Sequence, residues 1–270
     1  MERVWAMYFS GTGTTEKIVT NIAKKIGEEL TLSYHKFDFT FKNVRNIKKE
    51  FTKDDVVVFG VPVIAGRVPN LLLKYLETVK GNGALVIPIV LYGNRNYDDA
   101  LIELRNILAN NGFSPIAAGA FIGEHSFSEI LGKNRPDGQD MAVACSFASK
   151  IAEKIKSGNN LDVLVDVKGE DPIRPYYQPR DSKGNPIDIR KVKPKTNNLC
   201  VNCKLCVAIC PLGSIEYDNV KEVSGICMKC CACVKKCPTN AKYYDDENYL
   251  YHQHELEEQY ERRAEPEVFL

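Results

Sequence analysis

The amino-acid sequence predicts an α/β fold, a doubly wound parallel sheet of five strands followed by a small α+β domain. Strand-like and helix-like patterns alternate through residues 1–157, as they do in parallel sheets covered on both faces. A proline-rich stretch at 158–195 then interrupts the alternation and indicates a stiff linker. Beyond it, nine of the ten cysteines gather between Cys200 and Cys237. We therefore expect four segments: 1–157, the linker 158–195, a small domain at 196–245 and a C-terminal arm at 246–270.

The first strand is expected at residues 3–9, a nearly continuous apolar run of the kind found in strands buried on both faces. A loop rich in Gly and Thr follows at 10–16. The apolar period then changes to that of a helix, with Ile18, Ile22 and Ile26 on one face, and the pattern ends at Gly27.

The remaining elements follow from the same two periodicities. A weakly helical polar stretch is expected before Phe51. Further strands are predicted at 31–38, 55–63, 84–92 and 115–122, and further helices at 69–80, 98–110 and 137–157.

Three loops follow the first, third and fourth predicted strands, namely Ser10–Thr15, Val61–Pro69 and Tyr92–Tyr97. In open α/β sheets, ligands bind beyond the carboxyl ends of the strands where the strand order reverses. The three loops are therefore expected to lie together at a ligand site.

The first loop combines backbone amides at a helix start with several hydroxyls, which is an arrangement that binds phosphate. It contains neither the G-x-x-x-x-G-K-[ST] of nucleotide triphosphatases nor G-x-G-x-x-G. Ser10-x-Thr12-Gly13-x-Thr15 resembles the loop with which flavodoxins bind the phosphate of FMN, although Thr14 stands where that family usually has Asn. The alternative is a tight connection without a ligand. The resemblance implies the FMN phosphate ligands Ser10, Gly11, Thr12, Gly13, Thr14 and Thr15.

The same resemblance implies that the other two loops hold the flavin ring, in a sheet of flavodoxin-like order 2-1-3-4-5. The second loop lacks the aromatic residue that many flavodoxins stack on the flavin. In the third loop, Tyr97 is the candidate stacking face, Gly93 permits close backbone approach, and Asn94 is a candidate partner for polar atoms of the ring. The implied ring contacts are Pro62, Val63, Ile64, Ala65, Gly66, Tyr92, Gly93, Asn94, Arg95 and Tyr97.

Two charged or titratable residues near these loops are candidate catalytic groups. Arg67 can hold an anionic flavin or substrate, and the alternative is an ordinary surface arginine. His125 follows the fifth predicted strand and can donate a proton near neutral pH, the alternative being a hydrogen-bonded surface histidine.

The cysteines form two copies of C-x2-C-x2-C-x3-C-P, which is the ligand spacing of bacterial proteins with two iron–sulfur clusters. In that pattern the fourth cysteine of each run ligates the other cluster. One [4Fe–4S] cluster is thus predicted on Cys200, Cys203, Cys206 and Cys237, and the other on Cys227, Cys230, Cys233 and Cys210.

Zinc and disulfides are the alternatives for these cysteines. Zinc sites use paired C-x2-C units rather than two identical runs of four with a trailing proline, and disulfides need an oxidising compartment. Cys231 falls outside the pattern and is expected to face the cluster or the core. Cys145 is expected to be a small buried residue.

The cysteine runs resemble two-cluster bacterial ferredoxins, and most of the chain resembles a fusion family of anaerobes that joins a flavodoxin-like domain to such a ferredoxin. The segments that carry the resemblance are 8–15, 60–69, 92–100, 123–127 and both cysteine runs. It implies an electron-transfer iron–sulfur flavoprotein that serves a redox partner protein. The alternatives are a flavin-dependent reductase of a small-molecule acceptor, and a ferredoxin whose flavodoxin-like domain binds no flavin and only docks partners.

Charge and hydropathy restrict the remaining classes. The formal net charge of +1 gives no support to nucleic-acid binding. From Asp245 onward the chain carries nine carboxylates and only two arginines, a formal charge of −7. Such an acidic segment can steer a basic partner or can simply be solvated. No apolar run reaches the ~18 residues of a membrane span. Without a secretory signal, we expect a cytoplasmic protein in a reducing setting.

Overall fold

The computed structural model describes all 270 residues. Its central sheet has the order β2-β1-β3-β4-β6-β9, with a short strand, β5, also paired to β4. All pairs are parallel except that between β6 and β9. The strand bounds are β1 Arg3–Tyr8, β2 Ser33–Asp38, β3 Asp55–Pro62, β4 Leu85–Tyr92, β5 Ser114–Pro115, β6 Ala118–Ile122 and β9 Glu267–Phe269. With β5 and β6 counted as one strand, the predicted flavodoxin-like order is confirmed.

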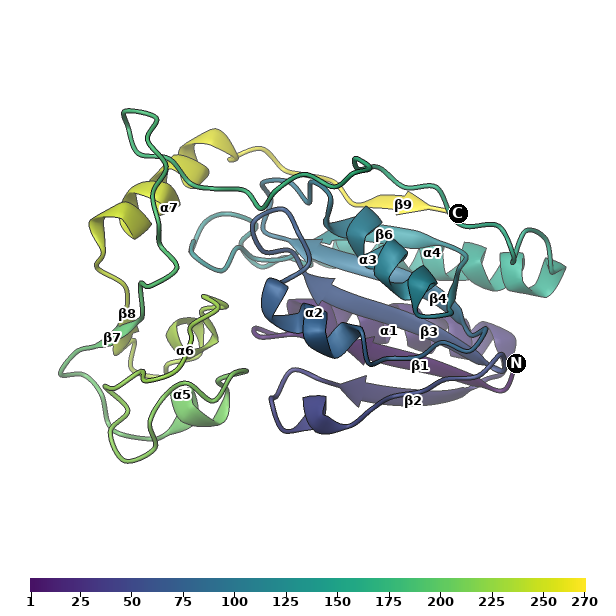
Figure 1. Cartoon of the computed structure of the whole chain (residues 1–270), viewed down its shortest axis with the longest axis horizontal. Helices are drawn as coiled ribbons and strands as arrows, with labels where there is room; N and C mark the ends of the chain where they lie inside the picture. The colour runs from purple at the N-terminus through teal and green to yellow at the C-terminus, as the bar shows by residue number, and fades with distance from the viewer.

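Helices cover both faces of this sheet (Figure 1). On one face, α1 (Thr14–Leu30) and α4 (Gly138–Ser157) pack on an apolar cluster that includes Ile22 and Phe147. On the other face, α2 (Asn70–Leu76) and α3 (Ala100–Asn110) pack on a cluster that includes Phe59 and Leu104. The burial of strands on both faces explains their continuous apolar runs.

Four predicted elements differ from the structure. The helix predicted at 69–80 is the shorter α2, which ends at Leu76. Helix α1 continues past Gly27 to Leu30, because the missing side chain lets the helix approach β1: a Cβ there would lie 2.9 Å from Val4 Cγ1. The fifth strand is interrupted between β5 and β6. The polar stretch before Phe51 contains only a 3₁₀ turn at Val44–Asn46.

The C-terminal arm packs on the sheet domain. Its last residues form β9, in which Val268 pairs with Gly119 at the sheet edge. The arm also contains α7 (Glu247–Gln259), which the sequence analysis did not predict. Only Tyr249, His252 and Leu256 of α7 are buried, so its apolar stripe is too sparse to recognise.

The first part of the linker, through residue 177, lies along the same domain, and the remainder runs past α7 to β7 (Figure 1). Asp99, at the start of α3, anchors the first part: its carboxylate accepts the backbone N–H groups of Glu170 at 3.0 Å and Arg174 at 2.7 Å. The Arg174 guanidinium also donates to both Asp99 oxygens. Arg105 Nη1 adds a bond of 2.9 Å to the carbonyl of Val165. The prolines therefore stiffen a segment that is also fixed by hydrogen bonds.

Replacement of Asp99 should release this anchor. Arg174 and the two backbone donors lower the pKa of Asp99 to about 2. Its carboxyl therefore stays charged, and its stabilisation is fully present at every pH above its unfolded pKa of about 4. We expect Asp99→Asn to lower the free energy of unfolding by roughly 2 kcal/mol. This loss should be constant from about pH 5.5 to about pH 8 in urea titrations.

The matched control for this prediction is Asp188→Asn. Asp188 pairs with Arg190, whose side chain is 88% exposed, so the pair is screened by solvent and its loss should have little effect. Equal stability of the Asp99→Asn variant and the unmodified protein would contradict the anchoring role.

Residues 196–245 lie beyond the carboxyl ends of the parallel strands (Figure 1). They contain two single-turn helices, α5 (Leu205–Ala208) and α6 (Ala232–Lys235). Strand β7 (Lys195–Thr196) pairs antiparallel with β8 (Lys242–Tyr243), and this pairing brings the two ends of the region together. None of the helices in the chain combines the length and the apolar composition that a bilayer crossing demands.

Candidate functional site

The two cysteine runs share one backbone conformation. Asn202 and Lys229, at equivalent positions of the two runs, have φ of 56° and 58°. Two residues later Lys204 and Cys231 have φ of 62° and 56°, and a single helical turn follows in each run. The left-handed conformation is unfavourable for residues other than glycine. Its repetition at matching positions shows that the two runs fold in the same way.

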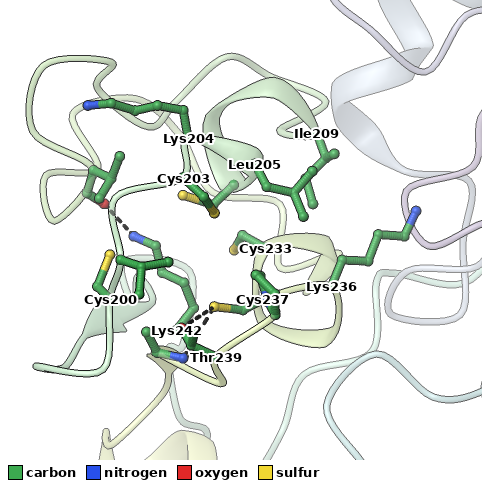
Figure 2. A pocket seen from close by; sticks show the side chains of 15 residues that line it. Cys200, Cys203, Lys204, Leu205, Ile209, Cys233, Lys236, Cys237, Thr239 and Lys242 are labelled. Atoms are coloured by element: carbon green, nitrogen blue, oxygen red, sulfur yellow. Dashed lines mark hydrogen bonds between the residues drawn. The ribbon is translucent and has the colours of Figure 1, made fainter.

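The first cysteine group lines one cavity. Cys200, Cys203 and Cys206 of the first run meet Cys237 of the second run there, and Cys233 also borders the cavity (Figure 2). The backbone N–H of Ala241 donates to Cys237 Sγ at 3.2 Å, and at the equivalent place that of Ser214 donates to Cys210 Sγ at 3.3 Å. Cys237 of the second run therefore lies beside the cysteines of the first run.

The second cysteine group is more deeply buried. The pKa of the Cys230 thiol is raised to about 11, mainly by burial and in smaller part by the neighbouring Cys227 and Cys210 thiols. Without a bound cation the Cys230 thiol would therefore stay protonated, and iron is the kind of charge that would stabilise it as a thiolate. Cys231 is 3% exposed and its thiol donates to the carbonyl of Lys229, so it faces the core.

No group of three or more His, Cys, Asp or Glu side chains is placed to hold a single metal ion. A [4Fe–4S] cluster binds each thiolate through a different iron, so its ligands surround a larger object than one ion. The cavity is lined by Cys200, Cys203, Cys206 and Cys237, which together supply the four protein sulfurs that such a cluster requires.

The second cysteine group lies against the ligand edge of the sheet. A Cβ on Gly11, in the predicted phosphate loop, would lie 3.0 Å from Cys230 Cβ. Arg45 Nη2 donates to the carbonyl of Pro211 at 2.9 Å, and Lys235 pairs with Glu124. These contacts make the first group the outer one, and Cys203 is exposed.

The predicted phosphate loop retains free donors. Ser10 Oγ accepts the N–H groups of Gly13 at 3.2 Å and Glu16 at 3.1 Å. Gly13 has a φ of 104° and open space beside it. Four backbone N–H groups in the loop and the first turn of α1 have no hydrogen-bond partner in the structure, namely those of Gly11, Thr12, Thr14 and Thr15. Such amides at the start of a 17-residue helix fit a phosphate.

The predicted ring contacts of the third loop are engaged by the C-terminal arm instead. Asn94 Nδ2 donates to the carbonyls of Tyr260 at 2.7 Å and Arg262 at 2.6 Å, and its Oδ1 accepts the N–H of Ala264. The Tyr97 hydroxyl donates to Glu267 at 3.0 Å, and its ring is 4% exposed beside Tyr92 in the core. Asn94 and Tyr97 therefore anchor the arm and present no free face to a flavin.

The second loop is covered by the linker. The carbonyl of Ala65 accepts the N–H of Tyr177 at 2.8 Å, and Val63 and Ile64 pack against the core. The side chain of Arg95, in the third loop, pairs with Asp98 and lies over the Tyr177 ring. Pro62 ends β3, and Gly66 is in contact with Asp98.

Arg67 is not free to bind an anion. Its guanidinium donates to both carboxylate oxygens of Glu103, at 2.7 and 2.6 Å, and lies 4.8 Å from the centre of the Tyr176 ring. The side chain of Glu103 is 5% exposed, so this ion pair is well shielded from water. Its role is to fix the second loop to α3 and the linker.

His125 is also not available as a proton donor near neutral pH. Its pKa is lowered to about 3, mainly by removal from water and in smaller part by the nearby charges of His252, Lys235 and Arg95. Its Nδ1 accepts the N–H of Phe127 at 3.1 Å, which fits a neutral ring. The polar sequence around His125 gave no sign of this burial.

Gly93 makes room for that ring. A Cβ at this position would lie 2.3 Å from His125 Cδ2 and 2.8 Å from its Cα. We expect Gly93→Ala to displace the 123–127 loop and lower the free energy of unfolding by about 1–3 kcal/mol, measured in urea. Gly138→Ala, where nothing lies within 4 Å, is the control and should cost less than about 0.5 kcal/mol. Identical stability of the two variants would contradict the close packing.

Sequence reasoning missed two tyrosines beside the second cysteine group. The hydroxyls of Tyr244 and Tyr249 lie 3.6 Å from Cys227 Sγ and Cys231 Sγ, respectively. One signal was available: Tyr217 and Tyr244 occupy equivalent positions of the two repeats.

No family model and no curated protein matches the chain. Solved structures do align with its sheet domain at low similarity. A flavodoxin from the domain Archaea is 15% identical, with a TM-score of 0.40, over 58% of this chain and 99% of that one. A Streptococcus pneumonia flavodoxin is 16% identical, with a TM-score of 0.38, over 56% of this chain and 99% of that one.

An apo NADH:FMN oxidoreductase, EmoB, is 13% identical, with a TM-score of 0.40, over 57% of this chain and 90% of that one. The flavodoxin-like fold of the sheet domain is identified by its strand order, independently of these alignments.

Proposed function

We propose that the chain is an electron-transfer protein that holds two [4Fe–4S] clusters within residues 196–245, at the ligand edge of a flavodoxin-like domain. The observation that carries this proposal is the convergence of Cys237 with Cys200, Cys203 and Cys206 around one cavity. The spacing of two-cluster ferredoxins requires that crossing, whereas a run that held its own metal would keep its four cysteines together.

The residues of this chain position the clusters and shape their surroundings. Backbone amides of Ala241 and Ser214 donate to the sulfurs of Cys237 and Cys210. The outer group, with exposed Cys203 and the exposed apolar side chains of Leu199 and Val201, is the face that we propose for a redox partner protein. The second, inner group lies against Gly11 of the sheet domain, which is close to Cys230 and Pro211.

FMN is the second cofactor that we propose, and the support for it is confined to its phosphate. The free amides of Gly11, Thr12, Thr14 and Thr15 and the adjacent hydroxyls fit that group. The predicted ring contacts do not fit, because Asn94 and Tyr97 are bonded to the arm. When bound, a flavin would supply one- or two-electron chemistry beside clusters that carry single electrons.

A flavin-free docking domain is the second candidate function, and the closed third loop favours it. The reductase alternative receives less support, because Arg67 is paired with Glu103 and His125 is neutral. Flavin released by heat from anaerobically purified protein separates the candidates. About one FMN per chain supports the flavoprotein, and no flavin together with no uptake of added FMN supports the docking domain.

The cluster proposal is tested by electron paramagnetic resonance. Dithionite-reduced protein should show the spectrum of two magnetically interacting [4Fe–4S] clusters, since the two cysteine groups share one small region and Cys233 borders both. A protein that shows no iron–sulfur signal after anaerobic purification and reconstitution with iron and sulfide would contradict it.

A further inference from the structure

Two tyrosines of the C-terminal region, the half-buried Tyr244 and the buried Tyr249, lie beside the inner cysteine group. The rings of Tyr244 and Tyr249 are stacked, with centroids 4.2 Å apart and planes inclined by 18°. The Tyr244 hydroxyl lies 3.6 Å from Sγ of Cys227, and the Tyr249 hydroxyl lies 3.6 Å from Sγ of Cys231. The two hydroxyls thus approach two different sulfurs, of which only Cys227 belongs to the ligand pattern.

The direction of the Tyr244 contact follows from the state of its partner. Between a hydroxyl and a free thiol, either group can donate. A cysteine bound to iron is a thiolate without a proton, so the Tyr244 O–H is then the donor. The Cys231 thiol already donates to the carbonyl of Lys229 at 3.4 Å, and Tyr249 therefore acts on a sulfur outside the cluster.

We propose that Tyr244 donates an O–H···S hydrogen bond to Cys227 and thereby raises the reduction potential of the inner cluster, an inference that rests on the proposed function. Reduction adds negative charge to the cluster and its thiolates, and a donor to a ligand sulfur stabilises that added charge. The proposal assigns to Tyr244 a positioning role in tuning one of the two clusters.

The first repeat lacks the equivalent contact. Tyr217 stands where Tyr244 stands in the second repeat, but its side chain is 66% exposed and its ring faces Lys204 at 4.9 Å. Helix α7 accounts for the difference, because Asp246 caps its start by accepting the N–H of Tyr249 at 3.0 Å and this fixes the stacked pair. Because of the arm, the two proposed cluster sites differ in whether a tyrosine hydroxyl lies beside a ligand sulfur, although their sequences are repeated.

The test is a redox titration of the full-length, cluster-loaded protein, followed by electron paramagnetic resonance under anaerobic conditions. Tyr244→Phe should shift one of the two midpoint potentials to a more negative value. We expect about a tenfold change in the one-electron reduction equilibrium, equivalent to about 59 mV. The other midpoint should stay in place. A site-specific Tyr244→3-fluorotyrosine replacement, which retains the shape and donates more strongly, should shift the same midpoint in the opposite direction.

Tyr217→Phe and Tyr249→Phe are the matched controls, and neither should move a midpoint. Unchanged midpoints in both Tyr244 variants would overturn the inference. An equal shift in Tyr249→Phe would also overturn it, because packing rather than the hydrogen bond would then be responsible. Absence of cluster signals in the unmodified protein would instead overturn the proposed function on which the inference rests.

Discussion

Replacement of Cys237 by alanine is expected to remove the cluster that the first cysteine run holds, although Cys237 belongs to the second run. Cys237 shares a cavity with Cys200, Cys203 and Cys206. Without a fourth thiolate at that corner, the site cannot hold a four-iron cluster through protein sulfur alone. Tightly bound iron should therefore fall from about eight to about four per chain, as two cubanes become one.

The identity of the surviving cluster distinguishes the crossed arrangement from an uncrossed one. Cys237→Ala and Cys200→Ala should leave the same reduced spectrum, that of the inner cluster. Cys210→Ala and Cys227→Ala should leave the other spectrum. Cys231→Ala is the control and should retain both clusters, since its thiol faces Lys229 and Tyr249. If Cys237→Ala instead matched Cys227→Ala, each run would hold its own cluster and the proposed ligand sets would be wrong.

The largest loss of stability is expected when Asp140 is replaced by alanine. Asp140 is fully buried in the first turn of α4 and pairs with Arg135, whose side chain is 4% exposed. Its carboxylate also accepts the N–H of Asp137 at 2.9 Å and completes a capping box with that residue. The substitution leaves a buried guanidinium without its counter-charge, which costs about 3–5 kcal/mol.

The same substitution should loosen the C-terminal arm. Arg135 Nη1 donates to the carbonyl of Ala264 at 2.6 Å, so the ion pair also fixes the arm before β9. Urea unfolding followed by circular dichroism gives the free energy, and limited proteolysis reports cleavage at 260–266. The control is Lys168→Ala, which removes the ion pair between Lys168 and Glu267. The Lys168 side chain is 67% exposed, so this substitution should lower the free energy of unfolding by less than about 1 kcal/mol. An Asp140→Ala variant as stable as that control would contradict this account.

Most of the sheet domain could be predicted from local patterns. The strands β1, β3 and β4 are buried on both faces, so each appears as an apolar run, and their alternation with helices indicates parallel order. The arm could not be predicted in the same way. Strand β9 has three residues and exists because β6 offers an open edge. Its neighbour α7 is stabilised by contacts made far from it in sequence.

The same distinction between local patterns and distant contacts applies to the candidate site. The cysteine runs and the Ser10–Thr15 loop are contiguous motifs whose spacing reflects their own geometry, and the structure places Cys237 beside the first run. The partners of Asn94, Tyr97 and Arg67 could not be predicted from the sequence for a different reason. Their partners are Tyr260 and Arg262, Glu267 and Glu103, all distant in sequence. Loop residues alone do not reveal which other segment will occupy them.

The most direct test of the central claim is the metal and sulfide content of the anaerobically purified full-length chain. Two [4Fe–4S] clusters require about eight iron and about eight acid-labile sulfide per chain, with zinc well below one. Flavin measured in the same sample separates the flavoprotein from the docking domain without affecting this result. About two zinc per chain and no labile sulfide would contradict the account, because the cysteines would then hold single ions rather than clusters that transfer electrons.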